Sequence, residues 1–220
     1  MATFTDKNDV ARAAKVRGDR SLLSRDYLWD LALQGRIFVA GTALEGTALT
    51  GRTSLADTTP DIALVSTPST IVVPLYFEAL VSAEGGAAPD WYITYVQANV
   101  GITTAGTTLS AFSLMGPNGP GSGAILQAAP TYGAFTGVQN ALLRNAQNSL
   151  DNYVSVEQVT KAAGTKQDNY NNDGSRIIWA APVPIAMKDG AAWLFHGSTG
   201  TTGQDFEWTL YWAEVAAADV

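Results

Sequence analysis

The sequence predicts an all-β fold, an antiparallel β-sandwich or jelly roll with a short helical segment at its N-terminus. Three observations support this prediction. From residue 36 onward, short apolar or alternating runs are separated by clusters of Gly, Thr, Pro, Asn and Asp, the pattern of many short strands. Convincing helical character is confined to residues 6–33. The length of 220 residues suits one large β domain, and no linker divides it.

The N-terminal region divides the chain into a helical arm, residues 1–35, and a β domain, residues 36–220. Asp6 or Asn8 can cap the start of a helix, and a short amphipathic piece follows and stops near Gly35. The apolar positions of that piece are Leu22, Leu23, Tyr27, Leu28, Trp29, Leu31 and Leu33. Two interpretations remain open: the segment docks on the core of its own domain, or it reaches a neighbouring subunit.

The β domain is expected to contain about ten strands. They lie near 36–42, 61–66, 70–82, 91–100, 107–114, 124–128, 153–161, 175–182, 191–197 and 205–215. Between 140 and 150, Ala141, Leu142, Leu143 and Ala146 suggest one or two helical turns. The Gly- and Thr-rich stretches 41–59 and 116–123 are expected to be surface loops where subunits or ligands meet.

Two of these strands indicate which faces are buried. In 205–215, large apolar residues alternate with mostly polar ones, as in an antiparallel strand with one buried face; the apolar residues are Phe206, Trp208, Leu210 and Trp212. In 70–82 we expect one apolar face made of Ile71, Val73, Leu75, Phe77, Ala79 and Val81. Pro74 has no N–H to donate to a neighbouring strand, so this strand should lie at an edge or beside a bulge.

The composition suits a protein whose surface is largely covered by copies of itself, a trait that secreted β modules share. Hydrophobic residues make up 46 % and charged residues 15 %, whereas soluble domains carry roughly 25 % charge. The net charge is −7. Residues 1–36 hold seven basic and five acidic residues, so they carry +2 and the remainder carries −9. This excess is too small for an Arg-rich nucleic-acid arm, but it leaves weak contact with phosphates or lipid headgroups as an alternative to a solvated or packed helix face.

The sequence contains no cysteine, which excludes disulfides and Cys-ligated zinc or iron–sulfur sites. Met1 is followed by polar and charged residues rather than an apolar signal, and there is no run of about 18 apolar residues. We therefore expect no signal peptide and no transmembrane helix, and synthesis in a cytoplasm.

His196, the single histidine, is the first candidate for catalysis. A nucleophilic triad would join it to Ser198 or another serine and to Asp205 or Asp189, but the spacing does not support one, and there is no G-x-S-x-G elbow. A hydrogen-bonded structural histidine at the end of a strand is the favoured interpretation. With one His and no Cys, a zinc or iron site is not expected. The chain is predicted not to be an enzyme and to use no cofactor.

Asn169, Asn171, Asp173 and Gly174 imitate the first half of a calcium loop. The twelfth position of such a loop would be Ala180, where a bidentate Glu is required. A polar turn is therefore favoured over a calcium site, and no metal ligand is predicted.

Acidic and aromatic residues in the strands leave two further alternatives. A pair of carboxylates for glycoside hydrolysis could come from Glu78, Glu157, Glu207 and Glu214, although solvated strand faces are favoured. A platform for sugar stacking could come from the tryptophans, although core positions are favoured; they are Trp29, Trp91, Trp179, Trp193, Trp208 and Trp212.

Two longer stretches carry a resemblance to a known class of proteins. PDIALVSTPSTIVVPLYFEALVSAEG at 60–85 looks like a loop leading into a long strand, and GAAWLFHGSTGTTGQDFEWTLYWAEV at 190–215 looks like a closing hairpin. Together they resemble capsid proteins of tailless bacterial or archaeal viruses, a similarity of style spread over about residues 36–215. The resemblance implies a single jelly roll that self-assembles by symmetry into a shell, with the N-terminal arm inside the shell or between subunits.

The same resemblance implies partners and a location. The partners are copies of the chain itself, as trimers, pentamers or hexamers within the shell, and other virion proteins. The location is the virion of a bacteriophage or related virus, after synthesis in the host cytoplasm. The alternatives are a carbohydrate-binding β-sandwich, a virion spike or fibre protein and a β-jelly-roll hydrolase.

Overall fold

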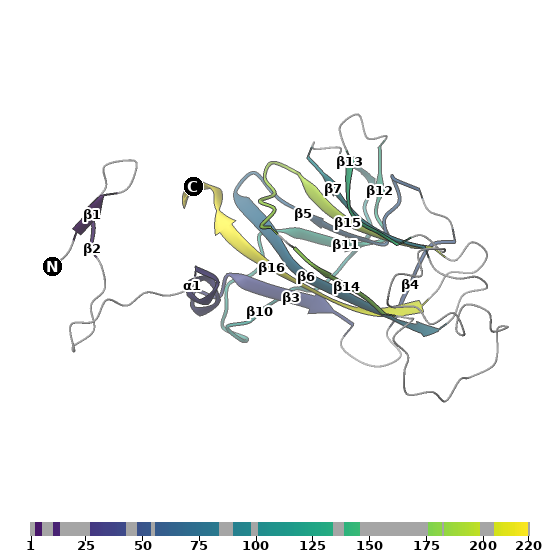
Figure 1. The fold of residues 1–220 in the computed structure, drawn as a ribbon, viewed down its shortest axis with the longest axis horizontal. Coiled ribbons are helices and arrows are strands. Elements are labelled where there is room, and N and C mark those ends of the chain that lie inside the picture. The colour runs from purple at the N-terminus through teal and green to yellow at the C-terminus, as the bar shows by residue number, and fades with distance from the viewer. Residues whose placement is uncertain are drawn as a thin grey trace.

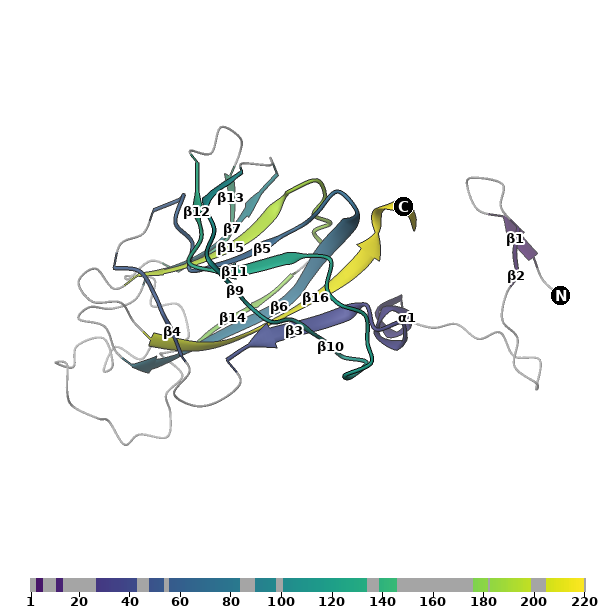
Figure 2. The ribbon, with the colours of Figure 1, turned by 180° about the vertical axis from the view of Figure 1, so that it is seen from behind.

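The protein is all-β, with antiparallel sheets and little helix, as the sequence predicts (Figures 1 and 2). The computed structural model describes residues 3–5, 11–13, 27–42, 48–53, 56–83, 90–97, 101–133, 139–145, 176–181, 183–198 and 205–219. Within these residues, the helical elements are α1 (Tyr27–Leu33) and the 3-10 turn η2 (Ala217–Asp219).

Two six-stranded antiparallel sheets form the body of the molecule. The first sheet has the order β10 (Phe112–Ser113), β3 (Ile37–Gly41), β16 (Asp205–Ala216), β6 (Thr70–Ala83) and β14 (Arg176–Ala180), and β4 (Leu49–Thr50) pairs with the start of β16. The second sheet has the order β13 (Gln139–Asn145), β7 (Asp90–Val96), β15 (Ala192–Ser198), β5 (Ile62–Val65), β11 (Ile125–Ala128) and β9 (Thr107–Thr108).

The eight main strands pair in a nested order. The first pairs with the last, β3 with β16; the next pair inward is β5 with β15, then β6 with β14, and the innermost is β7 with β13. The outermost and third pairs join through β16 and β6 in the first sheet. The second and innermost pairs join through β15 and β7 in the second sheet. The chain therefore behaves as one long antiparallel ribbon that is wound into two layers.

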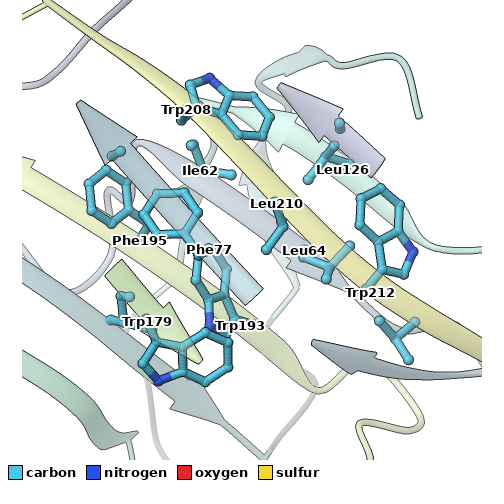
Figure 3. Packing of buried hydrophobic residues seen from close by; sticks show 14 of the residues in the cluster. Ile62, Leu64, Phe77, Leu126, Trp179, Trp193, Phe195, Trp208, Leu210 and Trp212 are labelled. Carbon is cyan, nitrogen blue, oxygen red and sulfur yellow. The ribbon is translucent and has the colours of Figure 1, made fainter. Parts of the chain in front are cut away.

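Aromatic side chains from both sheets fill the space between the layers (Figure 3). Phe77 of the first sheet lies 5.1 Å from Trp193 and 4.6 Å from Phe195 of the second, measured between ring centroids. Phe195 in turn meets Phe206 edge to face. Such pairs add about 0.5–1.5 kcal/mol each beyond the area they bury. This cluster holds the two layers together.

Strand β16 has the predicted faces. Phe206, Trp208, Leu210 and Trp212 are buried in the core, while the alternate residues Glu207, Thr209 and Tyr211 are half-buried on the outer face. The strict alternation results from the period of two in an extended strand.

Strand β6 departs from its predicted face because it contains a bulge. Tyr76 lies opposite Tyr211, but Pro74 lies opposite Trp212, so Leu75 is an additional residue on β6. The core side therefore holds Val72 before the bulge and Phe77 after it, while Val73 and Leu75 lie against α1. The expectation of one continuous apolar face is wrong. Of the two positions proposed for Pro74, the one beside a bulge is confirmed, since β6 lies between β16 and β14.

Further layers cover the outer faces of both sheets. Leu31 of α1 packs on Ile37 and Ala213 of the first sheet. On the second sheet, β8 (Ile102–Thr104) and β12 (Thr131–Tyr132) pair with each other, and Ile102 and Tyr132 pack on a second apolar cluster. The strand residues of that cluster are Ala63, Val65, Val96, Ala192 and Leu194. For α1, docking on the body is thus the interpretation that the structure supports.

Residues 11–13, expected to be helical, form a strand. β1 (Thr3–Thr5) and β2 (Ala11–Ala13) form an antiparallel hairpin in place of a helix that begins near Asp6. The helix is confined to α1 among the described residues of the arm. Ala11, Ala13 and Ala14 lack the spacing of an amphipathic helix, so local pattern gave no basis for extending the helix this far forward.

Two other predicted elements differ from the structure, and three short strands were not predicted. Residues 139–145 form strand β13 rather than helical turns, since Ala141 and Leu143 pair with β7. The strand expected at 107–114 is divided into β9 and β10, which belong to different sheets. The short strands β4, β8 and β12 were not predicted. The strand expected at 153–161 lies outside the described residues.

Candidate functional site

An exposed apolar surface lies where α1 meets β10, and we call it the α1–β10 patch. Trp29 is 67 % exposed and Phe112 is 65 % exposed. The other exposed members are Leu28, Leu33, Leu114 and Met115. Single exposed apolar residues are normal, but several large ones on neighbouring elements make this surface a candidate for binding another molecule.

Hydrogen bonds join the residues that follow α1 to the segment at β10, and Figure 2 shows these two elements side by side. Ser113 Oγ donates to the carbonyl of Gly35, and the Leu114 amide donates to the carbonyl of Ile37. Gly35 has a φ of +71°, and a side chain at this position would meet Pro120 and Met115. Glycine therefore permits both the left-handed turn after α1 and the close approach of the 113–120 loop.

A buried carboxylate ties the far end of that loop to the body. Glu214 of β16 accepts hydrogen bonds from the hydroxyl of Ser122, the amides of Gly123 and Ala124, and the indole Nε1 of Trp212, the last at 2.8 Å. Stretch 116–123 is irregular, as predicted. Glu214 accepts hydrogen bonds from backbone amides at the end of this stretch, and so it holds the segment between β10 and β11 in one conformation.

A second buried polar cluster lies at the opposite end of the body, around Asp61. The Asp61 carboxylate accepts the amide of Arg52 at 2.9 Å and the amide of Gly197 at 2.6 Å. The guanidinium of Arg52 donates to the carbonyl of Ala129 at 2.8 Å and to that of Pro130 at 3.2 Å. These bonds connect four separate stretches of the chain at one point.

Burial shifts the pKa values of two groups in this cluster in opposite senses. Desolvation raises the pKa of Asp61 to about 6, although the amides of Gly197 and Arg52 and the charge of Arg52 act against the rise. Desolvation, helped by the charge of Arg52, lowers the pKa of His196 to about 4. In both cases the low-polarity surroundings disfavour the charged form.

The structure places His196 apart from Asp205 and Asp189, the two acids considered for a catalytic triad. Its Nε2 lies 3.4 Å from Thr94 Oγ1 under the outer layer of the second sheet. Asp205 instead accepts a hydrogen bond from Thr50, and Asp189 lies in the turn before β15, at the other end of the strand from His196. The predicted hydrogen bond of a strand-end histidine is present. The side chain of Ser198 lies outside the described residues.

The glutamates considered for glycoside hydrolysis and the tryptophans considered for sugar stacking differ among themselves in burial. Glu78 and Glu207 are half-buried on the outer face of the first sheet, and Tyr76 donates to Glu78 at 2.6 Å. Glu214 is buried, so its expected position on a solvated face is wrong. Trp179, Trp193, Trp208 and Trp212 are core residues, whereas Trp29 is exposed. Glu157 and the side chain of Trp91 lie outside the described residues.

The remaining expectations concern metals and membranes. The weighed calcium residues, Asn169, Asn171, Asp173 and Gly174, lie outside the described residues. Where side chains are described, no three His, Cys, Asp or Glu residues gather in a way that could hold a metal ion. Among the described helices, none is long and apolar enough to span a bilayer.

Sequence reasoning missed Asp61 and Arg52 because a contact between distant segments creates their environment. A signal for Asp61 was nevertheless present. It directly precedes the apolar run 62–65, and burial of that run removes the adjacent carboxylate from solvent, so that it requires hydrogen-bond partners. The α1–β10 patch had no comparable signal, because its two halves lie about 80 residues apart and only the fold joins them.

The chain was compared with protein-family models, with curated proteins and with solved structures, and no match was found in any of the three.

Proposed function

We propose that this protein is a viral capsid structural protein, a single jelly roll that self-assembles into the symmetric shell of a virion. The fold part of the proposal is supported by the nested pairing of β3 with β16, β5 with β15, β6 with β14 and β7 with β13. Eight strands wound as one ribbon into two sheets are the arrangement of a jelly roll, which is common in viral capsids.

A fold alone does not give a function, so the proposal depends on a surface. The observation that carries it is the α1–β10 patch, with Trp29 and Phe112 about two-thirds exposed on a rigidly held edge of the body. A monomeric protein would expose these side chains to water at all times. Association with other copies would bury them, while the net charge of −7 on each copy opposes that association at low ionic strength.

Assembly of identical copies explains how such a modest surface can suffice. A heterologous contact repeated by a rotation closes into a ring or shell, in which every copy makes the contact at least twice. Each contact can then be weak, since the closed assembly adds many of them together. The proposed copies are trimers, pentamers or hexamers within the shell, alongside other virion proteins.

The test is to express the full chain and examine it by negative-stain electron microscopy and analytical ultracentrifugation. We expect oligomers or closed particles for the natural sequence. The double variant Trp29→Ser/Phe112→Ser should sediment as a monomer. The protein concentration that it requires for assembly should be at least tenfold higher than that of the natural chain.

A matched control removes apolar surface from the opposite edge of the same sheet. Leu80 and Ile178 are 38 % and 44 % exposed on β6 and β14. The variant Leu80→Ser/Ile178→Ser should assemble like the natural chain. A natural chain that remains strictly monomeric across salt and pH contradicts the proposal.

The alternatives have different outcomes in the same experiments. A spike or fibre protein would form trimers that do not build shells. A carbohydrate-binding module would bind polysaccharides as a monomer and lose binding when one aromatic residue is replaced. The tryptophan platform is weakened by the burial of Trp179, Trp193, Trp208 and Trp212, which leaves Trp29 as the exposed tryptophan among the described side chains.

A further inference from the structure

The loop between β10 and β11 contains the run Gly116-Pro117-Asn118-Gly119-Pro120, which includes the one asparagine of the sequence that is followed by glycine. Asn118 is exposed, as are the four residues before it. An asparagine amide is chemically labile in proteins. It is most accessible to the following backbone nitrogen when that next residue is glycine, because glycine has no Cβ to keep the two groups apart. This loop therefore combines a reactive pair of residues with access to water.

Hydrogen bonds form a tight turn around this pair. The Gly119 amide donates to the carbonyl of Gly116 at 2.9 Å, and the Gly116 amide donates to the carbonyl of Ser113 at 3.1 Å. A Cβ on residue 119 would lie 2.5 Å from both the Cβ and the Oγ of Ser113. The fold thus requires glycine after Asn118, and a bulkier residue that would shield the asparagine does not fit there.

We propose that Asn118 is a site of spontaneous deamidation in the folded chain. The proton of the Gly119 amide passes to hydroxide, and the Gly119 nitrogen then attacks Cγ of Asn118. A bond forms between that nitrogen and Cγ, and the bond from Cγ to the side-chain nitrogen breaks. The departing nitrogen takes a proton from water and leaves as ammonia. Water opens the resulting cyclic imide at one of its two carbonyls, which gives either aspartate or isoaspartate at position 118.

The loop is anchored at its two ends, so the turn between the anchors can open without unfolding the body. Ser113 Oγ donates to the carbonyl of Gly35 at 2.8 Å at one end, and Glu214 accepts the Gly123 amide at 2.8 Å at the other. Between these anchors, residues 117, 118, 120 and 121 are exposed. Exposed loop backbone opens locally at a small fraction of the global free energy of unfolding. Such an opening releases the Gly119 N–H from Gly116 and allows the attack.

The reaction changes both the charge and the path of the chain. A carboxylate replaces a neutral amide, so the net charge goes from −7 to −7 − 1 = −8. Isoaspartate also lengthens the main chain by one carbon directly before Gly119. The next residue, Pro120, lies close to Gly35, since a Cβ on residue 35 would be 2.6 Å from Pro120 Cδ. The product should therefore disturb the contact between this loop and the turn after α1, beside the α1–β10 patch.

The test is to incubate the natural full-length chain at pH 8, at a temperature at which circular dichroism shows it folded, and to follow its peptides by mass spectrometry. Deamidation raises the mass of a peptide by about 1 Da, which assigns the reaction to a residue. We expect Asn118 to convert at least tenfold faster than Asn140 and Asn145, which belong to β13 and precede alanine. The converted chain should also elute later from an anion-exchange column, because of its additional negative charge.

Asn118→Gln is the matched variant, since it keeps an exposed amide at the same position. Attack by Gly119 on the longer side chain requires a larger ring, so the variant should convert at least tenfold more slowly than the natural chain. Fragmentation that distinguishes the two isomers should find isoaspartate among the products of the natural chain. Aspartate alone would show direct hydrolysis by water without attack by Gly119, and it would overturn the proposal. An unchanged mass at Asn118, or equal conversion at Asn118 and Asn140, would overturn it as well. None of these readouts depends on assembly, so the capsid proposal can fail while this one stands.

Discussion

At the scale of single residues, the buried carboxylates carry the most testable energetics. Glu214 lies among four donors, and two of them are backbone amides in a loop that has no sheet partner at that point. A hydrogen bond to a charged group contributes about 1.5–3 kcal/mol, and leaving a buried donor unsatisfied costs its full desolvation. The carboxylate is therefore an anchor for the loop rather than a chemical group awaiting a substrate.

We expect Glu214→Ala to lower the free energy of unfolding by about 3 kcal/mol, because it leaves the buried indole N–H of Trp212 unpaired and removes the acceptor of the part-buried Gly123 amide. Urea denaturation followed by tryptophan fluorescence measures the change. Glu207→Ala is the matched control on the same strand; its half-buried side chain lies on the outer face, and its effect should stay within about 0.5 kcal/mol. Equal losses for both variants would show that Glu214 has no anchoring role.

Asp61 and His196 give opposite dependences of stability on pH. The pKa of Asp61 is raised from 3.8 to about 6, so its contribution is complete at low pH and disappears as the pH rises through 6. The pKa of His196 is lowered from 6.5 to about 4, so its contribution is complete above 6.5 and disappears as the pH falls through 4. Each shift corresponds to about 3 kcal/mol at 1.36 kcal/mol per pKa unit, and the two contributions oppose each other between pH 4 and 6.

The two groups can be separated by substitution. Asp61→Asn should leave a protein whose free energy of unfolding falls as the pH drops from 6.5 to 4, because only the histidine contribution remains. His196→Gln should leave one whose free energy of unfolding rises over the same range. Chemical denaturation at half-unit pH steps measures both slopes. Slopes of the same sign in the two variants would show that one of the two shifts has the wrong sign.

At the scale of secondary-structure elements, the sequence predicted the long strands and missed what depends on contacts between distant segments. Strand β16 was predictable because strict alternation over Phe206–Trp212 reports one buried face directly. Strand β6 was predicted in extent but not in facing, because the additional residue Leu75 at the bulge moves the core side from even positions before it to odd positions after it. Helical turns were predicted between 140 and 150 because Ala and Leu favour helices, and the pairing of 139–145 with β7 overrides that preference.

The candidate surfaces were less predictable than the strands. The pattern of apolar residues at 22–33 indicated an amphipathic segment, yet nothing local distinguishes buried Leu31 from exposed Trp29. That distinction depends on which face of α1 meets Ile37 and Ala213. Predicting that the two halves of the patch lie together, or which groups contact Asp61, likewise requires the complete strand order. Local residue preferences do not give that order.

A glycine gives an element-scale test of the outer layer on the second sheet. The paired strands β8–β9 and β11–β12 bend together at Gly106 and at Ala129, whose φ is +49°. A Cβ at Gly106 would collide with the carbonyl oxygen of Ala128, a backbone atom that cannot move alone. Gly106→Ala should therefore lower the free energy of unfolding by about 2 kcal/mol, within the range for strain at a constrained backbone position.

Gly101→Ala is the control, because a Cβ there would meet nothing within 4 Å. Its free energy of unfolding should change by less than about 0.5 kcal/mol. Thermal unfolding of both variants, read by circular dichroism, makes the comparison. A stability of Gly106→Ala equal to that of Gly101→Ala would mean that the bend adjusts freely and does not constrain the layer.

At the scale of the whole molecule, apolar attraction and charge repulsion compete. The α1–β10 patch favours association, but each copy carries a net charge of −7. Two such copies repel at long range even though their arms carry +2, since the product of the net charges stays positive. Salt screens this repulsion with a Debye length of about 10 Å at 0.1 M and about 30 Å at 0.01 M, while burial of apolar surface is little affected. Ionic strength should therefore decide how far assembly proceeds.

We expect assembly of the natural chain to increase as sodium chloride is raised from 10 mM to 300 mM at pH 7.5, because the repulsion between acidic bodies is removed while the apolar contact persists. Light scattering over a dilution series measures the critical concentration at each salt concentration, and it should fall severalfold. The variant Trp29→Ser/Phe112→Ser should remain unassembled at both ends of the range. If added salt instead dissolves assemblies of the natural chain, ion pairs between copies hold them together, and the apolar patch is not the main contact.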